Sequence, residues 1–326
     1  MAQRRDQNVG SDVLVSPEEA FRNPFSIEDI QVFDDEMVRY LLERQSFGIT
    51  YQELARALHG TSSELIQRIN RLLPAQQQEQ FTVLVQQTLP AIEIEQARQR
   101  ILDKLFWELI YWKVPEMYEE LTEGEHLHPG IFASLASLLQ GSTVLDVGAG
   151  SGRASFECRW YGAARVYAVE PSPGLLHILA DKIRQRSEQW SILPCSGRFD
   201  ALPLADQSVD VSLSCSAFTA ANEMGGEAGL AELYRVTRAG GTIVIIWPRR
   251  VDHAWFKQHG FHYVSLPYKG EMSIHFRSFK AALHCAHLFY GNKKHVVRYL
   301  HIHQKPELPF SIIGMNPPCD YFWVAV

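Results

Sequence analysis

Hydrophobic residues recur at three- and four-residue steps through the first third of the chain. After Ser26 the repeating positions are Ile27, Ile30, Phe33, Met37, Tyr40 and Leu41. This spacing predicts a helix that begins directly after Ser26. Amphipathic segments at about 75–89 and 91–112 continue the pattern, so the sequence predicts an all-α N-terminal domain with no strand before residue 143.

Two Thr-x-x-Glu patterns lie within this helical region. Thr50 precedes Glu53 by three positions, and Thr61 precedes Glu64 by the same step. A Thr side chain can accept a hydrogen bond from the backbone three residues on, and the Glu can return one, so each pair predicts the start of a short helix.

The pattern changes after residue 143 to short β-rich runs separated by helical stretches. The runs are "TVLDVGAG", "RVYAVEP", "VDVSLS" and "GTIVIIWP", with "DYFWVAV" at the end of the chain. The helical stretch "GLAELYRVTRAGG" is predicted to end on its Gly-Gly pair. Such alternation predicts a doubly wound, Rossmann-like α/β domain with a parallel sheet. We therefore expect a disordered tail at 1–24, a helical cap or dimerisation domain at 25–121 and an α/β domain at 122–326.

Composition narrows the classes of protein that the chain can belong to. The 326 residues are 46% hydrophobic and 21% charged, with a formal net charge of −6, which is typical of a globular protein and provides no overall positive field for nucleic acid. Five scattered cysteines without CxxC pairs indicate a reducing compartment. No apolar run is long enough to cross a membrane, and the N-terminus has no signal-peptide core. We expect a cytoplasmic protein without a membrane partner.

The segment "VLDVGAGSGRAS" (144–155) carries the clearest chemical signal. Glycines at 148, 150 and 152 let the backbone turn tightly beside a ligand, and the following helix presents free N–H groups. Asp146 precedes the loop, and Glu170 ends the next strand eighteen residues after Gly152, where an acid can accept both hydroxyls of a ribose. In a nucleotide-dehydrogenase loop the third glycine would stand at position 153. Arg153 occupies that position here, so that class fits poorly.

These motifs, taken in order, resemble those of the class I S-adenosylmethionine-dependent methyltransferases that act on small molecules. The matching segments are "LDVGAGSGR", "VYAVEPSPGLLHILADK", "ALPLADQSVDVSLSCSAF" and "ELYRVTRAGGTIVIIWP". The resemblance covers roughly residues 120–262 and implies S-adenosylmethionine as the cofactor. It also implies a mostly parallel seven-stranded sheet whose last strand is antiparallel.

The resemblance assigns expected roles to the matching residues. Gly148, Ala149, Gly150 and Gly152 form the loop under the methionine part of the cofactor, which Asp146 orders. Glu170 would accept the ribose hydroxyls while Pro171 packs on the adenine. Ser214 and Ser216 would line the methionyl and reaction side.

The adenine pocket departs from the family pattern. Many relatives have an Asp four residues before the Leu-Pro pair, and here Arg198 occupies that position, followed by Phe199 and Asp200. Either Asp200 takes the role, or backbone groups beside Phe199 serve and the Phe199 ring stacks on the adenine.

The substrate side is expected between the two domains. Tyr111, Trp112 and Tyr118 precede the first strand, where aromatics of relatives fold over the cofactor, and Phe218 follows the fourth strand. Tyr118, His126 and His128 are the candidate catalytic groups, because a histidine that titrates near neutral pH can act as a general base. The alternative for each is a packing, capping or surface role.

Two further features allow other functions. Asn316-Pro317-Pro318 resembles the motif with which amino-methylating enzymes hold a nucleobase amine, although it follows the fifth strand rather than the fourth. Paired prolines favour a turn into the last strand, and we expect that turn. Residues 49–73 resemble a helix-turn-helix that would offer Gln67, Arg68, Asn70 and Arg71 to DNA. Packing against a second subunit is the alternative.

Methyl transfer to an oxygen, nitrogen or carbon of a small organic molecule is the function that these motifs favour. The alternatives are a cofactor-sensing DNA-binding regulator, nucleobase amino-methylation, and a non-catalytic subunit of a larger enzyme. The histidine pairs lack a completing ligand set, so we expect no metal. The segment "LDKLFWELIYW" (102–112) is apolar over much of its circumference, so we expect a homodimer that buries its second side.

Overall fold

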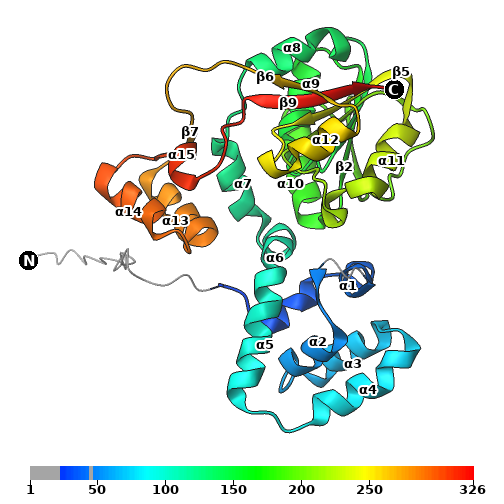
Figure 1. The fold of residues 1–326 in the computed structure, drawn as a ribbon, viewed down its shortest axis with the longest axis vertical. Coiled ribbons are helices and arrows are strands. Elements are labelled where there is room, and N and C mark those ends of the chain that lie inside the picture. Colours follow the sequence, from blue (N-terminus) through cyan, green and yellow to red (C-terminus); the bar gives the residue numbers. More distant parts are fainter. Residues whose placement is uncertain (1–22, 44–46) are drawn as a thin grey trace, which may run out of the picture.

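The computed structural model describes residues 23–43 and 47–326. The tail predicted at 1–24 lies outside the described residues except for its last two. A helical N-terminal part is followed by an α/β part, and the helices that connect them extend from one to the other (Figure 1).

The N-terminal part contains helices packed around one apolar cluster that runs from Phe25 to Ile110. Its elements are η1 (Ile27–Val32), α1 (Asp35–Glu43), α2 (Tyr51–Ala57), α3 (Ser63–Leu72), α4 (Ala75–Gln86), α5 (Ala91–Lys104) and α6 (Phe106–Lys113). The connecting helix α7 (Pro115–Gly124) leads into α8 (Gly130–Leu139). The prediction of helices throughout this region is confirmed.

Two local predictions in this region were wrong. The helix predicted after Ser26 is divided in two, because Phe33 adopts an extended conformation and the side chain of Asp34 accepts the backbone N–H of Met37 to start α1. The cap of α3 is Ser62, whose hydroxyl accepts the Leu65 N–H, and the Thr61 hydroxyl donates instead to Leu58 O. Thr50 caps α2 as predicted.

A seven-stranded sheet with the order β3-β2-β1-β4-β5-β9-β6 forms the centre of the α/β part. Its strands are β1 (Thr143–Val147), β2 (Arg165–Glu170), β3 (Ile192–Ser196), β4 (Val209–Cys215), β5 (Thr237–Ile246), β6 (His262–Ser265) and β9 (Asp320–Ala325). β1 to β5 are parallel, whereas β9 is antiparallel to both β5 and β6. The predicted Rossmann-like fold with an antiparallel last strand is confirmed.

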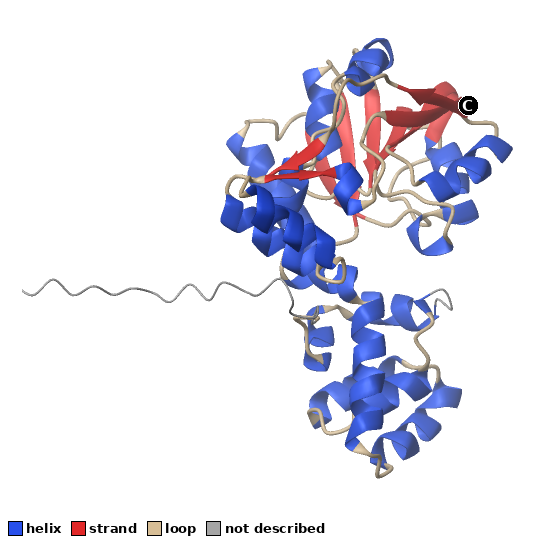
Figure 2. Cartoon of the chain, turned by 60° about the vertical axis from the view of Figure 1, so that its left-hand side comes forward, coloured by secondary structure: helices blue, strands red, loops and turns tan. Residues whose placement is uncertain are grey.

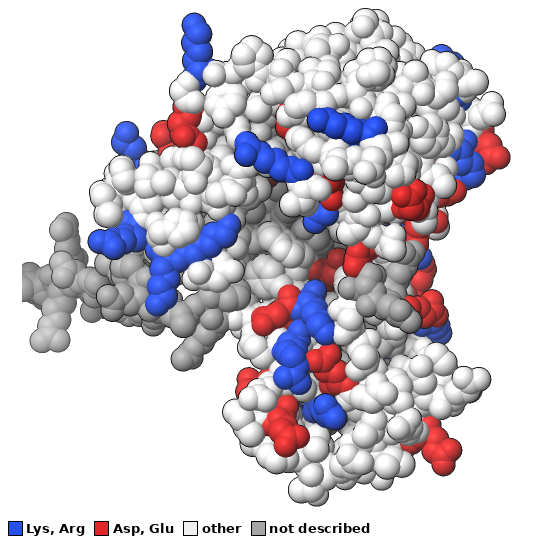
Figure 3. All heavy atoms as spheres, in the orientation of Figure 1, with Lys and Arg blue, Asp and Glu red and all other residues white. Residues whose placement is uncertain are grey.

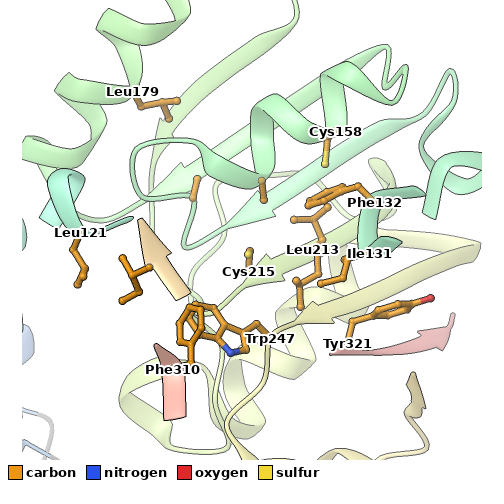
Figure 4. Close-up of a cluster of buried hydrophobic side chains, with 14 of the residues drawn as sticks. Leu121, Ile131, Phe132, Cys158, Leu179, Leu213, Cys215, Trp247, Phe310 and Tyr321 are labelled. Carbon is orange, nitrogen blue, oxygen red and sulfur yellow. The ribbon is translucent and has the colours of Figure 1, made fainter. Parts of the chain in front are cut away.

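Helices cover both faces of this sheet (Figure 2). They are α9 (Arg153–Trp160), α10 (Pro173–Gln185), α11 (Gly226–Val236) and α12 (His253–Gln258), with short turns η3 (Asn222–Met224) and η4 (Arg250–Asp252). One core lies between the sheet and α8 to α10, where Leu213 and Cys215 of β4 lie near Ile131 and Phe132 of α8 (Figure 4). The predicted Gly-Gly helix end was wrong, because α11 ends at Val236 and Gly240 and Gly241 belong to β5.

An insertion between β6 and β9 was missed by the sequence patterns. It consists of β7 (Ser273–His275), α13 (Phe279–Tyr290), α14 (Lys294–His303), β8 (Glu307–Pro309) and α15 (Phe310–Ile313). It lies beside α7 at the junction of the two parts (Figure 1). Two of the histidines, His301 and His303, lie in α14 of this insertion.

The insertion also covers the broad apolar segment 102–112. Phe289 of α13 stacks on Trp107 with ring centroids 5.4 Å apart and meets Phe106 edge-on. Leu102, Leu109 and other residues of this segment face the helical core. Phe289 thus covers part of the second apolar side from within the chain, while Trp107 remains 43% exposed.

Candidate functional site

The glycine loop turns at the carboxyl ends of β1 and β2. Gly148 and Ala149 donate their N–H groups to Val169 O at 2.9 and 3.0 Å. Gly148 has a φ of 70°, and a Cβ built on it would lie 2.6 Å from Ala217 Cβ and 3.0 Å from the Phe199 ring. Both the left-handed backbone and the close approach favour glycine here. The space beside position 148 is therefore too narrow for any side chain.

Glu170 connects the loop to the next turn. Its two carboxylate oxygens accept the Gly150 N–H and the Ser172 N–H, each at 3.0 Å. Burial is the main cause that raises the pKa of Glu170, to about 7, although these two bonds oppose the shift. Each carboxylate oxygen retains a lone pair for a further donor, so the side chain can hold a ligand hydroxyl while it orders the loop.

Asp146 lies fully buried beneath the loop. Ser155 Oγ donates to one carboxylate oxygen at 2.6 Å, while the other, Oδ1, is buried and lacks a protein partner. Burial raises the pKa of Asp146 to about 6. A buried acceptor without a donor is costly, so Oδ1 is suited to a cationic or N–H group of a ligand. Gly152 plays a different part: it begins α9 and packs against Leu179.

A cavity of about 110 Å³ opens between the glycine loop and the helical part. Gly148, Gly150, Glu170, Pro171 and Ser216 line its α/β side. The helical and connecting segments contribute Met37, Tyr40, Phe47, Glu108, Tyr111 and Tyr118. Ala149 and Asp146 line a smaller adjoining hollow under the loop, which Tyr118 also borders. Most of the predicted cofactor residues thus meet in one place.

The adenine side of the cavity contains the three residues among which the sequence could not choose an adenine contact. Arg198, Phe199 and Asp200 all line it. Arg198 pairs with Glu36 of α1 at 3.0 Å, and its guanidinium lies 4.4 Å from the Tyr40 ring centroid. Arg198 therefore joins the α/β part to α1, while Asp200 and the Phe199 ring remain the groups that can contact a base.

Arg153 joins the buried Glu125 to the exposed Ser216 in a polar cluster beside the loop. It donates to Glu125 Oε2 at 3.2 Å and to Ser216 Oγ at 2.6 Å, and it lies over the Trp247 ring. Burial raises the pKa of Glu125, and the charge of Arg153 opposes this shift. Sequence reasoning noted Arg153 only as a departure from another motif. Arg153 is the first residue of α9, directly after the glycine loop, and this position is the sequence signal for a side chain that contacts the site.

The predicted substrate residues divide into two groups. Tyr111 and Tyr118 face the cavity with ring centroids 4.9 Å apart. Trp112 packs edge-on against Phe33 in the helical core. Phe218 is buried against Phe199 and Phe256 and does not line the cavity.

Ser214 and the two candidate histidines also lie outside the cavity. Ser214 Oγ accepts the Phe218 N–H. His126 and His128 line a separate polar hollow between α7, α9 and α10, which Arg153 also lines. His128 Nδ1 accepts the Gly130 N–H at 3.1 Å. Neither histidine is brought to the cofactor residues, so the only predicted catalytic group that borders the cavity is Tyr118.

Asn316-Pro317-Pro318 forms the connection from α15 into β9, which confirms the predicted turn. The carbonyl of Asn316 accepts the Trp247 indole N–H at 2.9 Å, and Pro318 O accepts the His128 N–H. None of the three residues lines the cavity. Their backbone carbonyls hold neighbouring segments together.

The polar side chains of the helix-turn-helix-like segment are mostly engaged within the protein. Arg68 donates to Asp35 at 2.8 Å and Arg71 lies 3.7 Å from the same carboxylate. Asn70 donates to Thr82. Lys, Arg, Asp and Glu are interspersed on the face of the helical part seen in Figure 3, without a continuous basic patch. These contacts favour a packing role for α3.

Residues 23–43 and 47–326 contain no group of three or more His, Cys, Asp or Glu side chains arranged to hold a metal ion. Over the same residues, no helix has both the length and the apolar character needed to span a membrane.

Comparison with known proteins identifies what this arrangement is similar to. Residues 145–245 match the family described as methyltransferase domain. Malonyl-[acyl-carrier protein] O-methyltransferase of Yersinia pestis is 39% identical over 104 residues, which cover 32% of this chain and 36% of that protein. Demethylmenaquinone methyltransferase of Thermobifida fusca is 38% identical over 106 residues, covering 32% and 43%.

The match to each of these curated relatives spans less than half of the relative's own length. Among solved structures, a SAM-dependent methyltransferase from Aquifex aeolicus is 19% identical, with a TM-score of 0.38, and covers 48% of this chain and 93% of that one.

Proposed function

Because the chain carries the α/β domain of the class I S-adenosylmethionine-dependent methyltransferases, we propose that it transfers a methyl group from that cofactor to a small organic molecule. The observation that carries the proposal is the glycine loop with an acid on either side of it. Asp146 Oδ1 is buried and unpartnered beneath the loop, and Glu170 holds the loop from the neighbouring strand.

The residues present fit this cofactor group by group. Asp146 Oδ1 suits the ammonium of the methionine part, and the free lone pairs of Glu170 suit the ribose hydroxyls. Pro171, Phe199 and Asp200 line the side where an adenine would lie. The bound cofactor supplies a methyl group activated by its sulfonium sulfur. The protein's own residues bind and orient the reactants and exclude water.

The acceptor molecule is proposed to enter between Tyr118 and Ser216, which border the cavity from opposite domains. Arg153 fixes the Ser216 hydroxyl from behind. Alignment of two reactants in a closed pocket provides a large part of the rate in displacement reactions. The names of the two curated relatives specify a carrier-bound malonyl group and a demethylmenaquinone, and we propose only the class that they share, an organic acceptor.

We also propose that residues 25–121 cap the site. α1 and α6 supply one wall of the cavity, and the Arg198–Glu36 pair holds α1 over the adenine side. Removal of this part would open the cavity to water.

Titration calorimetry with S-adenosylmethionine and S-adenosylhomocysteine tests the cofactor. A thermal-shift screen of phenols, amines and organic acids in the presence of S-adenosylhomocysteine then tests the acceptor class. Binding of both cofactor forms, followed by a hit that is methylated, is the expected outcome. Absence of binding by either cofactor form at millimolar concentration would refute the proposal.

A further inference from the structure

Glu108 is a carboxylate in the cavity that neither the motifs nor the family resemblance assigns to a role. It lies on α6, in the helical part, and faces the same space as Gly148, Gly150 and Glu170. Among residues 23–43 and 47–326 we find no group that donates a hydrogen bond to its carboxylate or forms an ion pair with it. Burial raises the pKa of Glu108 to about 7, and the charge of Glu170 adds to the shift.

The position of Glu108 is fixed by packing at the turn after β2. Ser172 Oγ donates to Tyr111 O at 2.6 Å, which ties α6 to the residue that also donates its N–H to Glu170. A Cβ on Gly174 would lie only 2.7 Å from Tyr111 O, so α10 and α6 are in close contact there. Glu108 and Tyr111 are three residues apart and share one face of α6. The carboxylate is therefore held against the space beside Glu170.

The Glu108 side chain is partly exposed and lines the cavity, so its carboxylate is available to a donor on a ligand that enters there. The adenosine part of the cofactor brings donors to this side of the cavity, namely two ribose hydroxyls and the adenine amino group. We propose that Glu108 accepts a hydrogen bond from the adenosine, so that the helical part completes the cofactor site with a carboxylate of its own. This inference rests on the proposed function and adds a binding residue to it.

The charged and titratable groups that line the cavity together with Glu108 come from several elements, and Glu170 is the one whose charge raises the pKa of Glu108. They are Tyr40 on α1, Tyr111 on α6, Tyr118 on α7, Glu170 on β2, Arg198 and Asp200 after β3, and Glu223 in η3. An adenosine donor favours the ionised carboxylate and lowers its pKa in the complex. Binding then releases a proton, so cofactor affinity should rise as the pH increases toward 7 and level off above it.

The test compares Glu108→Gln with Glu116→Gln, which removes the same charge from an exposed position on α7. Calorimetry with S-adenosylhomocysteine at pH 8 should show roughly tenfold weaker binding for Glu108→Gln and parent affinity for Glu116→Gln. The melting temperature of ligand-free Glu108→Gln should be equal to or higher than that of the parent, because the substitution removes a carboxylate that is repelled by the charge of Glu170. If the role of Glu108 were merely structural, the substitution would lower the melting temperature.

Ligand analogues locate the donor. S-inosylhomocysteine lacks the adenine amino group, and 2′-deoxy and 3′-deoxy analogues each lack one hydroxyl. The parent should bind one of these more weakly than S-adenosylhomocysteine, and Glu108→Gln should lose that discrimination. If Glu108→Gln keeps parent affinity and parent discrimination while Glu170→Ala weakens binding, the inference alone fails. If the parent protein does not bind S-adenosylhomocysteine, the proposed function fails with it.

Discussion

A methyl group added at Gly148 tests whether the glycine loop is a ligand site or only a turn. Gly148→Ala places a side chain on a backbone with φ of 70°, and its Cβ meets Ala217 Cβ at 2.6 Å. The left-handed conformation costs about 1–2 kcal/mol, and the overpacking costs about 1–3 kcal/mol more. The sum predicts that the free energy of unfolding falls by about 2–5 kcal/mol.

Gly141→Ala is the matched control for backbone strain. Gly141 has a φ of 73°, and nothing lies within 4 Å of the Cβ that would be added. It lies between α8 and β1, at the amino end of this strand, whereas the glycine loop follows the carboxyl end. Its substitution should therefore lower the free energy of unfolding by only about 1–2 kcal/mol.

The assay pairs urea denaturation with calorimetry against S-adenosylhomocysteine. To relieve the contact with Ala217, the loop of Gly148→Ala must shift, which disturbs the Gly150 N–H bond to Glu170. If the shifted loop costs the ligand one charge-assisted hydrogen bond of about 1.5 kcal/mol, binding becomes roughly tenfold weaker. Gly141→Ala should bind like the parent. Parent affinity in Gly148→Ala would refute the ligand role of the loop, and equal weakening in both variants would show that strain alone is responsible.

Further predictions concern the other parts of the site. Glu170→Ala should weaken S-adenosylhomocysteine binding by roughly tenfold or more, since each bond to a carboxylate contributes about 1.5–3 kcal/mol; unchanged calorimetry would contradict the ribose assignment. Asn316→Ala should cost about 1 kcal/mol or less, because its carbonyl bond to Trp247 survives; loss of turnover with normal melting and cofactor binding would favour nucleobase chemistry instead. Deletion of residues 1–110 should give aggregated, inactive protein by light scattering, and a soluble, active fragment would count against the cap. The two-fold dimer stays a prediction from the sequence, and a monomeric mass for the full-length chain at micromolar concentrations would exclude it.

Local chemistry explains the parts of the site that the sequence predicted. The loop, Asp146 and Glu170 lie within consecutive strand–helix units, where hydrophobic runs set the strands and parallel pairing brings their carboxyl ends to one edge. Gly150 and Glu170 therefore meet for reasons already present in one strand–loop–helix–strand unit. The antiparallel β9 followed from the family resemblance rather than from its own pattern.

Long-range packing explains what the sequence missed. Glu108 and Glu170 are 62 residues apart in the sequence. They lie close enough to interact because α6 is tied to the turn after β2 through Ser172. His126 and His128 are close to the first strand in sequence, yet they line a separate hollow together with Arg153 and do not line the cavity. A titratable residue near a motif in sequence need not be near it in space.

The sequence by itself thus determined the helical N-terminal part, the strand–helix units beside the glycine loop and the loop itself, because backbone conformation, hydrophobic periodicity and the spacing of acids act over short segments. Only the tertiary structure decided which side chains enclose the cavity. The insertion α13–α15 has the periodicity of ordinary helices, but whether Phe289 covers Trp107 depends on how distant segments pack. That choice is made by the burial of apolar surface over the whole chain, which no local pattern encodes.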